Sequence, residues 1–113
     1  METVKINERD LYAQIGMRIK EIRESQSEKL TQAKLGEFVG LERSSISNIE
    51  KGTQRVPLHI LFGLCATLRV DPSTVIPSID DVKVDTGVEE VRVGDKVLMM
   101  PSLVAQAIAG VRL

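Results

Sequence analysis

Residues 30–52 read LTQAKLGEFVGLERSSISNIEKG, the most informative segment of the chain. Its first half predicts a short helix that begins after Thr31, because a threonine hydroxyl can accept from the free N–H groups of the next turn. Gly40 stands where a chain that ends a helix often needs a left-handed residue. A second helix is expected to begin after Glu42 and to end at Gly52. The stretch therefore predicts two short helices joined by a tight turn.

Two short helices joined by such a turn cross at a steep angle, which is the helix-turn-helix arrangement. Gly36 is expected to face the second helix, where a side chain would keep the two helix axes apart. Ile46 and Ile49 hold the second helix against the rest of the domain. The residues on its other side must then point outward, and these are Arg43, Ser44, Ser47 and Asn48.

The outward residues are suited to contact with DNA bases, because a recognition helix presents its N-terminal residues to base edges in the major groove. Arg43 can bind guanine through two hydrogen bonds and Asn48 can bind adenine in the same way, while the serines can donate to a base or a phosphate. At Thr31 and Gln32 the first helix begins with free amides that can bind a phosphate. A second phosphate of the DNA backbone could be held by Lys51, Arg55 and the helix start at Pro57 and Leu58.

Three further helices are predicted around this pair. An apolar stripe with helical spacing runs through residues 8–25, on Leu11, Ile15, Ile19 and Ile22. Pro57 is suited to the first position of another helix. Asp71 followed by Pro72 predicts a last short helix, which reaches Ile76. Residues 1–76 are therefore expected to form one mainly α domain of five helices.

The pattern changes after Pro77. Val91-Arg92-Val93 alternates, and Gly94-Asp95 separates it from the β-prone run 96–100, which is a hairpin signal. Ser102 can cap a helix over about residues 103–109. We expect residues 77–113 to be a C-terminal extension of a β-hairpin and a helix. It is too short to bury much surface alone, so dimerisation is its expected role, with a passive extension as the alternative.

Together these segments resemble the Cro and lambda-repressor type of helix-turn-helix domain, the XRE-like family, over residues 15–76. The matching segments are IGMRIKEIR at 15–23, LTQAKL at 30–35, ISNIEKG at 46–52, Pro57, and LRVD at 68–71. The resemblance implies a mainly α fold, with a five-helix, lambda-repressor-like DNA-binding domain followed by the short extension. It implies double-stranded DNA as the partner, and a bacterium or a phage as the source.

The resemblance also implies a role for each matching residue. Gln32 would contact a phosphate and brace the recognition helix, and Glu50 would pair with Arg23 in a partly buried ion pair. The base-reading positions would be Arg43, Ser44 and Asn48, with Ser47 near them, and the positions along the DNA backbone would be Thr31, Gln32, Lys51, Thr53 and Arg55. Three departures from the family pattern stand out, and the first is Gly36, which replaces the usual alanine. The loop between Arg23 and Leu30 is longer than usual, and Glu42 stands where a Ser or Thr cap is usual.

Composition limits the other classes of function. The net charge is −1, with a balance of +1 over residues 1–76 and −2 over residues 77–113, so DNA binding must depend on a local surface. No apolar stretch approaches the length of a membrane span, which is about 20 residues. The single cysteine, Cys65, permits neither an intramolecular disulfide nor a cysteine-based metal cluster. We expect a cytoplasmic, nucleoid-associated protein with no metal and no cofactor.

The leading interpretation is a sequence-specific transcriptional regulator, most simply a repressor that binds an inverted-repeat operator as a homodimer. The alternative from another class is an antitoxin-type module that neutralises a partner protein and regulates its own operon. A self-cleaving repressor is a third interpretation, because Ala109-Gly110 resembles the dipeptide that such proteins cut. The tail is too short for the catalytic serine–lysine fold, so we expect no enzymatic activity.

Overall fold

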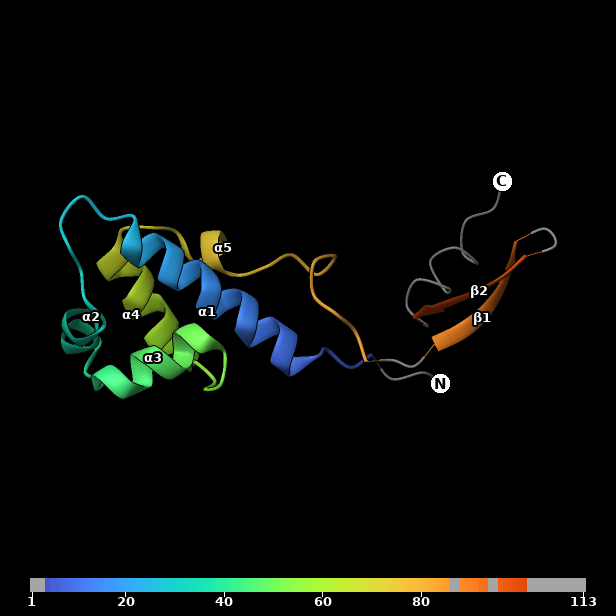
Figure 1. The fold of residues 1–113 in the computed structure, drawn as a ribbon, viewed down its shortest axis with the longest axis horizontal. Coiled ribbons are helices and arrows are strands. Elements are labelled where there is room, and N and C mark those ends of the chain that lie inside the picture. Colours follow the sequence, from blue (N-terminus) through green and yellow to red (C-terminus); the bar gives the residue numbers. More distant parts are fainter. Residues whose placement is uncertain (1–3, 86–87, 94–95, 102–113) are drawn as a thin grey trace. The chain divides into compact units, whose positions relative to one another are not determined.

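The computed structural model describes residues 4–85, 88–93 and 96–101. The five predicted helices are present: α1 (Glu8–Glu24), α2 (Gln32–Val39), α3 (Arg43–Lys51), α4 (Leu58–Leu68) and α5 (Pro72–Val75). They belong to one compact unit, Glu8–Val82, in which α3 packs against both α1 and α2, while α4 packs against α2 (Figure 1). The mainly helical fold expected from the sequence is therefore correct.

The helical unit is built around one apolar core. Its fully buried side chains include the two isoleucines of α3 and one residue from each of the other helices, namely Ile19, Leu35, Ile46, Ile49, Leu64 and Val75. Cys65 belongs to the same cluster, and burial raises the pKa of its thiol. A buried thiol with a raised pKa is a weak nucleophile, so Cys65 acts as a small core residue.

Two glycines let the helices approach one another closely. A Cβ atom added to Gly16 in α1 would lie 2.1 Å from the carbonyl oxygen of Ile49 in α3. A Cβ atom added to Gly36 in α2 would lie 2.4 Å from the carbonyl oxygen of Leu41, in the turn before α3. The expectation that Gly36 permits close packing therefore holds, and Gly16 does the same on the other side of α3.

The helix ends follow the sequence signals with one difference. The hydroxyl of Thr31 accepts from the amide of Lys34 at 3.1 Å, and the carboxylate of Asp71 caps α5 by accepting from the amide of Ser73 at 2.9 Å. Pro57 was expected as the first residue of α4, but it has extended backbone angles and is the N-cap. Its fixed φ suits either position.

Three large apolar side chains with helical spacing on α2 and α4 are exposed. Phe38 on α2 is 62% exposed, and Leu58 and Phe62 on α4 are 66% and 54% exposed. Each helix buries a narrower stripe than expected. Leu35 provides the buried core residue of α2, and on α4 the buried core residues next to Leu58 and Phe62 are Leu61, Leu64 and Cys65. Both phenylalanines of the chain therefore face outward.

The helical unit extends beyond the boundary predicted at residue 76. Val82 is buried, and the side-chain amide of Gln14 in α1 donates to the carbonyl oxygen of Asp81 at 2.8 Å. The chain segment from Pro77 therefore continues along the helices before the second unit begins at Lys83.

The second unit contains two antiparallel strands, β1 (Val88–Val93) and β2 (Lys96–Pro101), in which Val88 is opposite Pro101 and Val93 is opposite Lys96. It also includes the N-terminal segment, because Ile6 forms an antiparallel bridge with Val84. The sequence pattern gave no signal for that bridge. The hairpin turn expected at Gly94-Asp95 and the helix expected over 103–109 lie outside the described residues.

Candidate nucleic-acid interface

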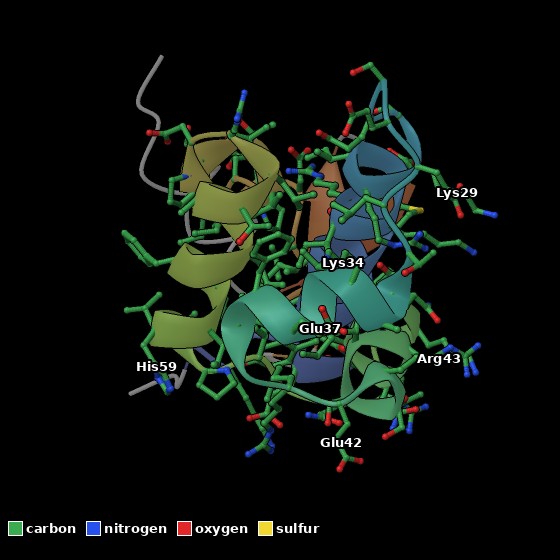
Figure 2. All side chains as sticks on the ribbon, turned by 90° about the vertical axis from the view of Figure 1, so that its left-hand side faces the viewer. Lys29, Lys34, Glu37, Glu42, Arg43 and His59 are labelled. Atoms are coloured by element: carbon green, nitrogen blue, oxygen red, sulfur yellow. The ribbon has the colours of Figure 1, made fainter. Side chains whose placement is uncertain are left out.

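Helix α3 presents a polar face outside the core. Ile46 and Ile49 are each 1% exposed and hold the opposite face inward. Arg43, Ser44 and Asn48 are exposed and Ser47 is half-buried, so all four expected base-reading residues lie on or beside the outer face. Figure 2 shows the Arg43 side chain projecting away from the body of the helical unit.

The orientation of α3 is set by one buried carboxylate, that of Glu50, whose side chain is 1% exposed. Arg23 of α1 donates to it twice, from Nε to Oε2 at 2.7 Å and from Nη2 to Oε1 at 3.0 Å. Gln32 of α2 donates from Nε2 to Oε1 at 2.9 Å. The hydrogen bond with Glu50 raises the pKa of Arg23, so the guanidinium stays charged. One side chain of α3 is thus held by both neighbouring helices.

The structure therefore brings Arg23 and Glu50 together, as the sequence analysis expected. The longer loop is accommodated because Nη1 of Arg23 donates to the carbonyl oxygen of Leu30 at 3.0 Å. Gln32 braces the recognition helix, and one of its side-chain N–H groups is used in doing so. A phosphate at the start of α2 would then be bound chiefly by backbone amides.

A basic hollow of about 530 Å³ lies beside the N-terminal end of α3. It is lined by the end of α1, the loop before α2, the start of α2 and the start of α3. The lining includes Arg23, Lys29 and Arg43 as cations and Glu24 as the one carboxylate, together with Thr31 and Gln32. Lys29 and Arg43 project from the same side of the helical unit (Figure 2). Lys29 was not identified from the sequence, because the polar run 25–29 predicted only a loop.

A second basic hollow, of about 550 Å³, lies beside the C-terminal end of α3. Three of the residues expected along the DNA backbone line it, namely Lys51, Thr53 and Arg55, and α1 adds Arg9 and Tyr12. The hydroxyl of Thr53 donates to the carbonyl oxygen of Asn48 at 3.2 Å, so it also closes the end of α3. Nη2 of Arg55 lies 2.6 Å from Oε2 of Glu8.

The two hollows lie beside opposite ends of α3. A helix of nine residues, the length of α3, spans about 13 Å. The major groove of B-DNA is about 12 Å wide, enough to admit an α-helix. Cationic residues therefore line hollows beside both ends of the polar face of α3.

The start of α3 carries a negative charge as well. Glu42 is the N-cap, but its side chain makes no capping hydrogen bond, and Figure 2 shows it pointing outward.

Within the described residues, no group of His, Cys, Asp and Glu side chains is placed to hold a metal ion. None of the described helices has the length and the apolar character of a membrane span.

A polar recognition helix, crossed by a second helix and flanked by cations, defines a helix-turn-helix DNA-binding protein. The sequence profile described as helix-turn-helix matches residues 19–75, which is half of the chain. The chain belongs to this family, the Cro/C1 type of DNA-binding transcription regulators. A search of curated protein sequences finds no match.

Solved structures show the same fold. The restriction-modification controller protein C.AhdI from Aeromonas hydrophila is 26% identical, with a TM-score of 0.57 over 62% of this chain and 99% of that chain. The clp gene regulator ClgR from Corynebacterium glutamicum is 22% identical, with a TM-score of 0.54 over 57% of this chain and 67% of that chain. The hypothetical transcription factor NHTF from Neisseria is also 22% identical, with a TM-score of 0.54 over 67% and 84%. These similarities support the five-helix fold and lend no support to the C-terminal hairpin.

Proposed function

We propose that this protein is a sequence-specific repressor that binds an inverted-repeat operator as a homodimer. The observation that carries the proposal is the exposed face of α3 between two basic hollows. In this arrangement Arg43, Ser44, Ser47 and Asn48 read bases. Repression follows when the occupied site overlaps a promoter. The 26% identity to a controller protein of a restriction-modification system supports a regulatory role.

The phosphate contacts hold α3 in register but carry no sequence information themselves. At the N-terminal end of α3 they come from the amides at Thr31 and Gln32, with Lys29 as an added cation. At the C-terminal end they come from Lys51 and Arg55. Thr53 joins them when its hydroxyl turns from the carbonyl oxygen of Asn48 to donate to a phosphate oxygen. Binding energy and specificity therefore reside in different side chains.

Selection of bound sequences from a randomised DNA pool, followed by light scattering of the complex, tests the proposal. An enriched inverted repeat with two protein copies is expected, because one recognition helix reads only a few base pairs and two half-sites lie about 34–36 Å apart. Recovery of no enriched sequence would contradict sequence-specific binding.

Arg43→Ala tests the reading of α3. The variant should lose about 1–3 kcal/mol of binding free energy on the selected operator and lose discrimination at one base position. Arg55→Ala is the matched control, because it removes one arginine from the backbone-binding region and should weaken all sequences alike. Binding of both variants to operator and scrambled duplexes gives the comparison. If Arg43→Ala weakens both duplexes equally, Arg43 does not read a base.

Two parts of the chain are candidates for the dimer contact. One is residues 83–113, and the other is the set of exposed apolar residues on α2 and α4, namely Phe38, Leu58 and Phe62. We expect a chain that ends at Val82 to be monomeric and to bind the operator more weakly, with its circular dichroism retained, since the helical unit has its own core. If light scattering gives the mass of two truncated chains, the dimer contact is assigned to the exposed apolar residues of α2 and α4 instead.

The antitoxin-type function remains the second candidate, because exposed phenylalanines are typical of protein interfaces. Phe38 and Ala66 line one hollow, which places the exposed ends of α2 and α4 next to each other. Expression with the neighbouring genes and recovery of a stoichiometric second protein would favour this function over the homodimer.

A further inference from the structure

The hollow at the C-terminal end of α3 already contains an anion. Oε2 of Glu8 lies 2.6 Å from Nη2 of Arg55, and the two side chains are 62% and 70% exposed. We propose that Glu8 occupies the place of a DNA phosphate in the free protein, within a backbone-binding site that Arg9 and Tyr12 of α1 complete. The inference rests on the proposed function and extends it to the first turn of α1.

The composition of the hollow suits a phosphate group. Three cations line it, Arg9, Lys51 and Arg55, against the single carboxylate of Glu8. Within the described residues, neither Arg9 nor Lys51 forms a salt bridge. The phenol of Tyr12 adds a neutral donor of the kind that often contacts phosphate oxygens. A phosphate in this hollow would have more donors than the carboxylate now uses.

Carboxylate and phosphate compete for the same guanidinium, because both present oxygen atoms that match its planar array of N–H donors. An exposed ion pair is weak, so a phosphate can replace Glu8 at little cost. Once replaced, the Glu8 carboxylate remains close to the phosphate and repels it. Glu8 should therefore reduce the affinity for DNA of any sequence.

The position of the hollow explains why this reduction would be independent of sequence. Lys51 is the last residue of α3, and Arg55 lies in the loop before α4, so both follow Asn48, the last of the proposed base-reading residues. Glu8 and Arg9 open α1, more than forty residues earlier in the chain. A ligand in this hollow meets the DNA backbone and no base edge.

The test is Glu8→Gln in the full chain, measured by fluorescence anisotropy with operator and scrambled duplexes over a series of salt concentrations. Affinity for both duplexes should rise about three- to tenfold at low salt and less at high salt, because the competing charge is gone. The plot of log affinity against log salt should become steeper by up to about one unit, since Arg55 now neutralises a phosphate with no internal counter-charge.

Glu37→Gln is the matched control, because Glu37 is also exposed and pairs with a single cation, Lys34, at 3.4 Å on α2 (Figure 2). It removes the same charge and should change the salt slope little. In the Arg55→Gln background, the gain from Glu8→Gln should be smaller, because only the repulsion between the carboxylate and the phosphate is then relieved. Arg9→Gln should lower affinity for both duplexes and flatten the salt slope by about one unit.

The inference is overturned if Glu8→Gln and Glu37→Gln have equal effects, or if the gain from Glu8→Gln is undiminished in the Arg55→Gln background. An unchanged affinity for Arg9→Gln removes α1 from the site. Thermal unfolding by circular dichroism establishes that each variant is folded. If the unaltered protein binds no DNA, the proposed function fails and the inference fails with it. If that protein binds DNA normally and only the Glu8 prediction fails, the proposed function stands.

Discussion

Replacement of Arg23 by methionine should lower the free energy of unfolding by about 3–5 kcal/mol, because it leaves the buried carboxylate of Glu50 without its cation. Arg23 supplies two of the three hydrogen bonds that the structure gives to that carboxylate, and Gln32 supplies the third. A neutral amide cannot offset the charge of a side chain that is 1% exposed. Urea denaturation followed by circular dichroism measures the loss.

The double variant Arg23→Met/Glu50→Met separates the value of the ion pair from the cost of an unpaired charge. Replacing both partners of a buried pair with apolar residues is often neutral or stabilising. The double variant should therefore regain most of the stability that Arg23→Met loses. A loss below about 1 kcal/mol in the single variant would mean that water reaches Glu50, in contrast to the burial described above.

Gly16→Ala should destabilise the helical unit by about 1–3 kcal/mol or more, because the new methyl group would collide with the backbone of α3. Its Cβ atom would lie 2.1 Å from the carbonyl oxygen of Ile49 and 2.8 Å from that of Glu50. Neither oxygen can move alone, so α1 and α3 must separate. The higher helix propensity of alanine returns only about 1 kcal/mol.

Gly63→Ala provides the comparison, because Gly63 is also a helical glycine but its added Cβ atom would meet only a side-chain methyl group, that of Val39, at 3.3 Å. That methyl group can shift by a few tenths of an ångström. Gly16→Ala should therefore have a clearly lower urea midpoint than Gly63→Ala. Equal midpoints would show that α1 and α3 are not held at the distance found here.

The helices and the ion pair could be predicted because their signals are local or repeat along the chain. The stripes on α1 and α3, the cap at Thr31 and the glycines that follow α2 and α3 each mark an element within a few residues. Arg23 and Glu50 are distant in sequence, and only the family resemblance connected them. Such signals indicate which residues form a helix and which face of that helix is buried.

The rest depends on tertiary packing that no local pattern contains. The start of α1 and the loop that follows α1 lie beside the two ends of α3. This packing brings Lys29, Arg9 and Tyr12 to the interface, although they are far from α3 in the sequence. Phe38 and Phe62 satisfied the apolar period but lie at the edge of stripes that their neighbours already fill. Exposure at the edge of a stripe depends on how the helices cross.

The location of Tyr12 also has an optical consequence. The chain has no tryptophan and one tyrosine, so its near-ultraviolet absorption and emission come mainly from a single ring. That ring lies in the hollow with Lys51 and Arg55. A polyanion entering there changes the polarity around the phenol, so the unlabelled protein contains its own reporter for occupation of this site, separate from any reading of bases by α3.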